Sequence, residues 1–100
     1  MPEDAADPIL ATPAQIETGH VFAEAHCAAC HAISATGKSP LRAAPPFRRL
    51  SERYAVADLA ESFAEGIVIG HTDMPEWVLD RSEITELLGY IDSIQPKRRR

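Results

Sequence analysis

Two cysteines and a histidine lie close together in the sequence Cys27-Ala28-Ala29-Cys30-His31. The chain has no other cysteine, and the C-x-x-C-H spacing is compatible with several kinds of chemistry. The two thiols could form a redox dithiol, contribute half of a zinc site, or attach a c-type haem. They could also be two buried cysteines with no chemical role.

The surrounding sequence favours haem attachment among these alternatives. A redox dithiol is typical of a βαβ setting, and no such pattern is present. A zinc ion would need a fourth ligand besides the two cysteines and His31, such as His26 or His20. By contrast, two thiols three positions apart at a helix end can reach the two vinyl groups on one edge of a porphyrin. The adjacent imidazole can then coordinate the iron from the same side.

A haem iron held by His31 has a sixth position that a second side chain can fill. Apart from Met1, the only methionine is Met74, which lies 43 residues after His31 in a polar loop and is followed by Pro75. Methionine usually fills gaps in a core, and this loop is poorly situated for that role. We therefore favour Met74 as the second axial ligand, with His71 as the competitor.

Three predicted helices would position these residues. Thr12-Pro13-Ala14-Gln15 has the pattern of a helix start and predicts a helix to about residue 26. A second helix is predicted over 56–65 and ends at Gly66. The capping box at 80–83 opens a third, whose apolar stripe runs from Ile84 to Ile94 before Pro96. The stretches 32–50 and 66–80 are predicted loops, and no alternating strand pattern is present, so the chain is predicted to be all-α.

The composition indicates that something besides side chains fills the interior. Hydrophobic residues make up 45% of the 100 residues, but sixteen of them are alanines. A chain this short buries a small share of its surface, so a core rich in alanine is marginal. A haem at the centre would supply the missing volume, and we expect the chain to be largely unfolded without it.

The net charge of −5 argues against a general nucleic-acid binder. Positive charge is concentrated in residues 38–53, which contain five basic side chains against Glu52 alone: Lys38, Arg42, Arg48, Arg49 and Arg53. No apolar run approaches the length of a membrane-spanning helix, so no transmembrane segment is expected.

Taken in order along the chain, these motifs resemble the class I, mitochondrial-type cytochromes c. The resemblance rests on CAACH at 27–31, APPF at 44–47, HTDMP at 71–75 and a final amphipathic helix. It covers about residues 14–95 and is closest to small soluble monohaem cytochromes of bacteria. It implies a class I cytochrome c fold, with three or more helices and long loops wrapped around one covalently bound haem c.

The resemblance also implies a role for each matching residue. Cys27 and Cys30 would form the thioethers, His31 would be the proximal iron ligand and Met74 the distal one. The carbonyl of Pro45 would accept a hydrogen bond from the other ring nitrogen of His31, which fixes the orientation of a ligand ring.

Further positions follow from the same resemblance. Gly19 and Tyr90 would lie where the first and last helices cross, which accounts for a glycine inside a helix. Arg53, Tyr54 and Trp77 are candidate partners for the carboxylates of the haem.

The implied function is that of a one-electron carrier, not of an enzyme. A ligand on each face leaves no open iron position, and docking to redox protein donors and acceptors would use the exposed haem edge. We expect a monomer whose basic residues 38–53 meet acidic partners. The alternative is a haem enzyme or a gas or redox sensor in which Met74 detaches.

The N-terminus bears on the location of the protein. Met1-Pro2-Glu3-Asp4 is acidic and is not the start of a signal peptide. Bacterial members of the family receive their haem after export, so the resemblance implies a mature periplasmic form. We expect a flexible leader over 1–11, a cytochrome c domain over 12–96 and a basic tail over 97–100.

Overall fold

The computed structural model describes residues 10–66 and 78–96. Over these residues the chain forms α-helices and short 3-10 helices (η) and contains no strand. In chain order they are α1 (Pro13–His26), η1 (Phe47–Glu52), η2 (Val56–Asp58), α2 (Leu59–Glu65) and α3 (Arg81–Ser93). The predicted all-α class is confirmed.

Both long helices begin at capping boxes. The Thr12 hydroxyl accepts from the backbone N–H of Gln15 at 3.1 Å, and the Gln15 side chain accepts from the Thr12 N–H at 2.8 Å. Asp80 and Glu83 form the same reciprocal pair at the start of α3, at 2.8 and 3.0 Å. Because these bonds satisfy backbone donors that a helix leaves free at its first turn, they fix where each helix starts.

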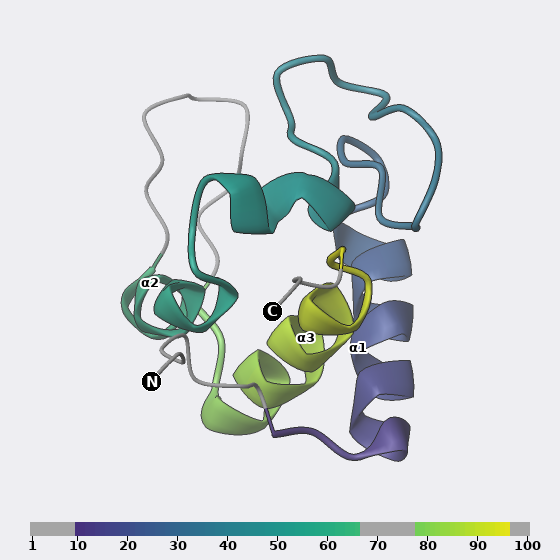
Figure 1. Cartoon of the computed structure of the whole chain (residues 1–100). Coiled ribbons are helices and arrows are strands. Elements are labelled where there is room, and N and C mark those ends of the chain that lie inside the picture. Colours follow the sequence, from purple (N-terminus) through teal and green to yellow (C-terminus); the bar gives the residue numbers. More distant parts are fainter. Residues whose placement is uncertain (1–9, 67–77, 97–100) are drawn as a thin grey trace.

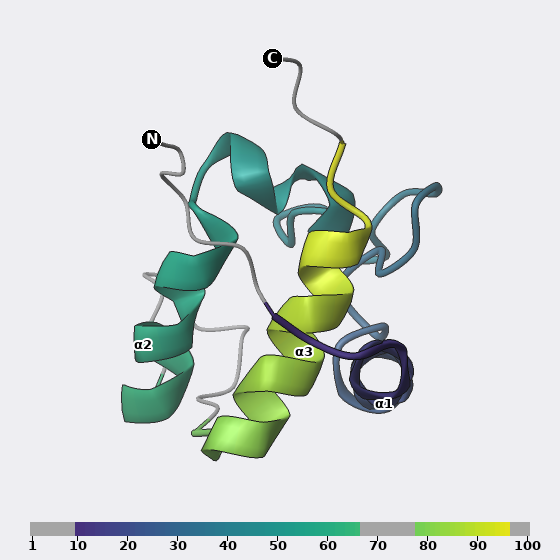
Figure 2. The ribbon, with the colours of Figure 1, turned by 60° about the horizontal axis from the view of Figure 1, so that its bottom comes forward.

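Helix α3 lies between α1 and α2 and packs against both (Figures 1 and 2). Gly19 makes the crossing of α1 and α3 possible, since a Cβ atom there would overlap the backbone carbonyl oxygen of Glu86. One turn along α3 from that contact, the ring of Tyr90 stacks on His20 with centroids 4.6 Å apart. The expectation that Gly19 and Tyr90 lie at the helix crossing is confirmed.

The 3-10 helix η1 lies partly within a stretch that the sequence predicted to be a loop. The side chain of Gln95, just beyond α3, holds it in place. Nε2 of Gln95 donates to the carbonyl of Phe47 at 2.6 Å, and its Oε1 accepts from the N–H of Ser51 at 2.9 Å. These contacts join residues more than forty positions apart, so no local pattern could have predicted them.

The core is built around α3. The largest side chains that are almost completely buried are Leu87, Leu88 and Ile91. They pack with apolar residues from the other elements, namely Ala23, Ile33, Phe47, Leu50, Val56, Phe63 and Leu79. Among the described residues, no helix is long and apolar enough to cross a membrane.

Several predicted features lie outside the described residues. These are the axial-ligand candidates His71 and Met74, the aromatic Trp77, most of the leader (1–9) and the basic tail (97–100).

Candidate functional site

The C-x-x-C-H motif begins where α1 ends. Cys27 is the C-cap of α1, and its N–H donates to the carbonyl of Ala23 at 2.8 Å. The chain then turns, with the N–H of His31 donating to the carbonyl of Cys27 at 2.9 Å. Both cysteines and His31 are partly buried, and neither cysteine forms a disulfide. The helix end therefore brings two thiols and an imidazole together on one turn.

The ring of His31 is oriented by a backbone carbonyl. Its Nδ1 lies 2.8 Å from the carbonyl oxygen of Pro45. A carbonyl can only accept, so Nδ1 must carry the proton and donate it. In a neutral imidazole this leaves the lone pair on Nε2, which is the nitrogen a metal would bind. The Phe47 ring packs against the imidazole with centroids 5.0 Å apart, which restricts its rotation.

The loop that carries Pro45 is itself held in place. The N–H of Phe47 donates to the carbonyl of Ala32 at 2.9 Å, and the N–H of Ala32 donates to the hydroxyl of Ser39 at 3.0 Å. The Tyr90 hydroxyl donates to the carbonyl of Ile33 at 2.7 Å, which ties the same loop to α3. The position of the Pro45 carbonyl thus depends on contacts within this loop and on one contact with α3.

The structure argues against a redox dithiol. Burial, together with a smaller contribution from the nearby Cys30, raises the pKa of the Cys27 thiol to about 11. Reactive dithiols instead have a cysteine whose pKa is lowered, because the thiolate is the nucleophile. Cys27 is therefore a neutral thiol at neutral pH.

A zinc site finds no support in the described part of the chain. Over 10–66 and 78–96, no three His, Cys, Asp or Glu side chains come together so as to hold a metal ion. His20, one of the two proposed fourth ligands, stacks on Tyr90 and lies 3.6 Å from the carboxylate of Glu24. His26 is exposed, and its ring packs on Phe22.

The segment that contains Met74 is flanked by two residues that bond to each other. Leu79, which precedes α3, donates its backbone N–H to the carbonyl of Phe63 in α2 at 2.9 Å. Both side chains are buried in the core. The described structure thus fixes residues on either side of this segment, while Met74 itself lies outside it.

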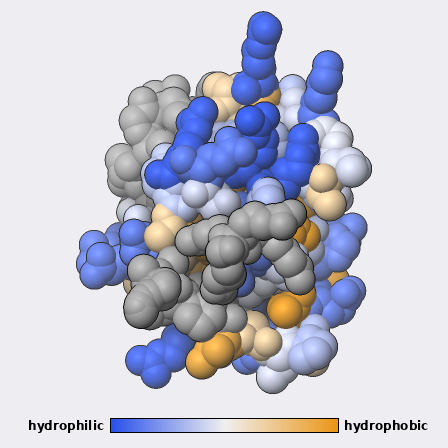
Figure 3. Space-filling model, in the orientation of Figure 1, coloured by the Kyte–Doolittle hydropathy of each residue, from blue (hydrophilic) through white to orange (hydrophobic). Residues whose placement is uncertain are grey.

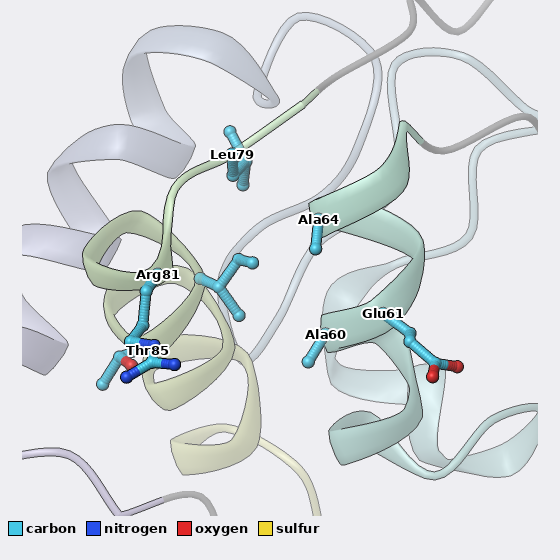
Figure 4. A pocket seen from close by; sticks show the side chains of 7 residues that line it. Ala60, Glu61, Ala64, Leu79, Arg81 and Thr85 are labelled. Atoms are coloured by element: carbon cyan, nitrogen blue, oxygen red, sulfur yellow. The ribbon is translucent and has the colours of Figure 1, made fainter.

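An open cleft of about 370 Å³ lies between α2 and the start of α3 (Figure 4). Apolar residues, including Ala60, Ala64 and Leu79, form much of its wall, and the carboxylate of Glu61 points away from it. The cleft brings together no pair of groups suited to acid–base or nucleophilic catalysis. It is also formed by elements other than the motif turn, so we do not assign it a role in the chemistry.

The sequence placed Arg48 only among the basic residues of 38–53 and did not indicate that part of its side chain is buried. Nη1 of Arg48 is buried and has no hydrogen-bond partner among the described residues. Of the residues considered as partners for haem carboxylates, Arg53 and Tyr54 are exposed. Nothing in the sequence distinguishes Arg48 from the neighbouring arginines, since the environment of its Nη1 depends on how η1 packs.

Comparison with known proteins gives one match. A family model described as cytochrome c matches residues 16–95, which include the motif turn and all of the helices except the first turn of α1. No curated protein and no solved structure matches the chain.

Proposed function

We propose that this chain, which belongs to the cytochrome c family, is a one-electron carrier whose haem iron is held between His31 and Met74. The family binds covalently attached haem c and uses it for electron transfer, and membership in the family implies both properties for this chain. The iron ligands, the redox partners and the location of the protein are our proposals.

The observation that carries the proposal is the hydrogen bond between His31 and Pro45. It keeps the proton on Nδ1 and directs Nε2 away from Pro45, so the imidazole is prepared to act as a ligand. The bond also increases the electron density on the ring, which strengthens binding to iron. When bound, the haem iron supplies the one-electron redox chemistry.

Cys27 and Cys30 would attach the haem. Each thiol would add across one vinyl group, with the sulfur bonding to one vinyl carbon and the hydrogen going to the other. The addition therefore needs no oxidant. Neither cysteine is in a disulfide, so both thiols are available for this addition.

Met74 would supply the second axial ligand. A neutral thioether disfavours the additional positive charge of ferric iron, so it favours the reduced state. It also fills the position at which small molecules would otherwise bind. Support comes from the sequence around Met74 and from the resemblance to class I cytochromes c.

Partner binding would use the basic residues of 38–53. Lys38, Arg42, Arg49 and Arg53 are exposed, although Arg49 is partly neutralised by Glu52 at 3.3 Å. Hydrophilic side chains gather on the upper part of the face in Figure 3, where Figure 1 draws η1. We therefore propose that acidic redox proteins dock beside the motif turn, guided by charge.

This docking surface can be tested with small redox reagents. Replacing Arg42 and Arg49 by glutamine should slow reaction with the anionic hexacyanoferrate(III) more than reaction with a cationic cobalt(III) complex. The difference should shrink as salt is added. Equal effects on both reagents would contradict the docking proposal.

We further propose that the protein is a periplasmic monomer, as the resemblance implies.

Voltammetry of the purified holoprotein tests the carrier function. We expect a single reversible one-electron wave and no binding of carbon monoxide by the ferrous protein at neutral pH. Rapid carbon monoxide binding by the native protein would show that the iron has an accessible position. That result would favour an enzyme or sensor over a carrier.

A further inference from the structure

The side chain of Gln95 makes three hydrogen bonds, which join two different elements. Its Nε2 donates to the carbonyls of Phe47 at 2.6 Å and Ile91 at 2.9 Å, and its Oε1 accepts from the N–H of Ser51 at 2.9 Å. Because a carbonyl only accepts and a backbone N–H only donates, the reverse orientation of the amide would break all of these bonds. The side chain therefore links the end of α3 to η1, which lie side by side in Figures 1 and 2.

The amide of Gln95 stands between two backbone groups that an α-helical turn would join. In an α-helix each N–H bonds to the carbonyl four residues earlier, so the N–H of Ser51 would donate directly to the carbonyl of Phe47. Here both groups bond to Gln95 instead. Three residues later, the N–H of Tyr54 does donate to the carbonyl of Leu50, four residues earlier, at 2.9 Å. A side chain inserted into this pattern opens the turn, so Gln95 favours the 3-10 geometry of η1.

Phe47 is the point at which η1 meets the C-x-x-C-H motif. Its carbonyl is held by Gln95, and its N–H donates to the carbonyl of Ala32 at 2.9 Å. Its ring is buried and packs on the imidazole of His31 with centroids 5.0 Å apart. Pro45, whose carbonyl oxygen lies 2.8 Å from Nδ1 of His31, is only two residues earlier. A shift of Phe47 would thus disturb both the ring and the carbonyl that orient His31.

We propose that Gln95 is a positioning residue for His31. By bonding to η1 it holds Phe47, and with it the carbonyl of Pro45, where they orient the imidazole. A hydrogen bond from Nδ1 makes the ligand more basic and stabilises ferric iron, so Gln95 keeps the reduction potential lower than it would otherwise be. The proposal rests on the proposed function, because it requires His31 to bind the iron, but it does not depend on Met74.

The test compares wild-type holoprotein with Gln95→Met, which keeps the length of the side chain and removes its hydrogen bonds. NMR of the ferrous form measures how fast the Nδ1–H of His31 exchanges with solvent, and voltammetry measures the reduction potential. Because the bond to Pro45 should open more often in the variant, we expect exchange to be about tenfold faster. We also expect a higher potential, because a weaker bond leaves less electron density on the ligand.

Ser93→Ala is the matched control. Ser93 lies at the same end of α3, and its hydroxyl donates to the carbonyl of Tyr90 at 2.6 Å, so this bond stays within α3. Its removal should weaken the end of the helix without changing either the exchange rate or the potential. Equal changes in Gln95→Met and Ser93→Ala would overturn the proposal, since Gln95 would then contribute only to general stability. Unchanged exchange and potential in Gln95→Met would overturn it as well.

Gln95→Glu decides if Gln95→Met does not retain haem. Its carboxylate can still accept from the N–H of Ser51 but cannot donate to the carbonyl of Phe47, so the Nδ1–H of His31 should again exchange faster. The exchange rate is the measurement here, because an added negative charge by itself lowers the potential. An unchanged rate would overturn the proposal.

The spectrum of the wild-type protein separates this proposal from the carrier function. When the imidazole of His31 is bound to ferrous haem, its ring protons are displaced strongly upfield by the porphyrin ring current. Wild-type protein without this displacement would contradict the proposed function. Wild-type protein with it, combined with an unchanged Gln95→Met variant, would refute the role of Gln95 alone.

Discussion

One ring nitrogen of His31 is hydrogen-bonded to the protein, which leaves the other ring nitrogen available to a metal. That division is set by a carbonyl 14 residues away, at Pro45. Because a carbonyl oxygen can only accept, Nδ1 of His31 must carry the proton, and the tautomer of a neutral imidazole follows. A single backbone contact thus determines which ring nitrogen would bind the iron in the proposed site.

Tyr90 supports the orientation of His31 indirectly, through the loop that carries Pro45. Its hydroxyl donates at 2.7 Å to the carbonyl of Ile33, two residues after His31. The pKa of Tyr90 is raised by burial, with further contributions from Glu24 and Glu17, so the hydroxyl stays protonated and remains a donor. The bond holds the start of the Pro45 loop against α3.

We predict that Tyr90→Phe lowers the free energy of unfolding by about 1–3 kcal/mol, because it leaves a buried carbonyl without a donor. Denaturant unfolding of the holoprotein measures this loss. Tyr54→Phe is the matched control, since Tyr54 is 42% exposed, and it should change stability by less than about 0.5 kcal/mol. Equal effects of the two changes would mean that the bond to Ile33 contributes nothing.

At the scale of elements, the crossing of α1 and α3 depends on the absence of a side chain at Gly19. The atom that a Cβ would meet is the backbone carbonyl oxygen of Glu86, which cannot move aside as a side chain can. The two helices must therefore separate if this residue becomes larger.

We predict that Gly19→Ala destabilises the protein by about 1–3 kcal/mol through overpacking. This occurs although alanine favours a helix over glycine by about 1 kcal/mol. Thermal unfolding followed by circular dichroism measures the change. Thr18→Ala, at the exposed neighbouring position, should have little effect. An increase in stability for Gly19→Ala would show that the helices do not pack as described.

The end of α3 carries an unfavourable charge. Burial raises the pKa of Asp92, and the residue lies in the last turn, where a negative charge opposes the helix dipole. A carboxyl whose pKa is raised by folding binds its proton more readily in the folded state. Its ionised form therefore costs stability at neutral pH, and this cost disappears as the pH falls through the raised pKa.

We accordingly predict that Asp92→Asn increases stability at pH 7 by about 0.3–1 kcal/mol. The gain should vanish in acid, below the normal range of an aspartate, and unfolding curves across this pH range measure it. Asp58→Asn, at the start of α2, should not stabilise, because negative charge is favourable at that end of a helix. A gain independent of pH would rule out the ionised carboxylate as the cause.

The sequence predicted helices well where local bonds define them. Thr12 and Asp80 open α1 and α3 as their capping boxes indicated, and Gly66 ends α2 with a φ of 101°. It did not predict η1, which depends on Gln95, or that Nη1 of Arg48 is inaccessible to solvent.

The motif at 27–31 was informative for a different reason. Its spacing encodes chemistry, so C-x-x-C-H pointed to haem before any fold was known. Which side chain pairs with a haem carboxylate depends on tertiary packing, and no local sequence pattern predicts it. Arg53 and Arg48 cannot be distinguished by sequence alone, but they differ clearly in exposure.

At the scale of the whole molecule, the described core contains few large buried side chains. Over residues 10–66 and 78–96, only Leu87, Leu88 and Ile91 combine large volume with almost complete burial, and all three belong to α3. A 100-residue chain with so limited a core is close to the limit of independent stability. A covalently held haem would add the largest apolar group in the interior.

We predict that the double variant Cys27→Ala and Cys30→Ala, which cannot attach haem, is largely unfolded. Far-ultraviolet circular dichroism should show little helix and no cooperative melting, whereas the holoprotein should melt cooperatively under the same conditions. A haem-free variant that keeps its helices and melts cooperatively would show that the polypeptide core is sufficient alone.

The central claim is that the iron is held by His31 on one side and Met74 on the other. Ferric haem bound to methionine sulfur has a weak far-red absorption band, so the most direct measurement is the absorption spectrum of the oxidised holoprotein in that region. The account predicts the band in the wild type and its loss in Met74→Ala. Absence of the band from the wild type, or its persistence in Met74→Ala, would contradict the account.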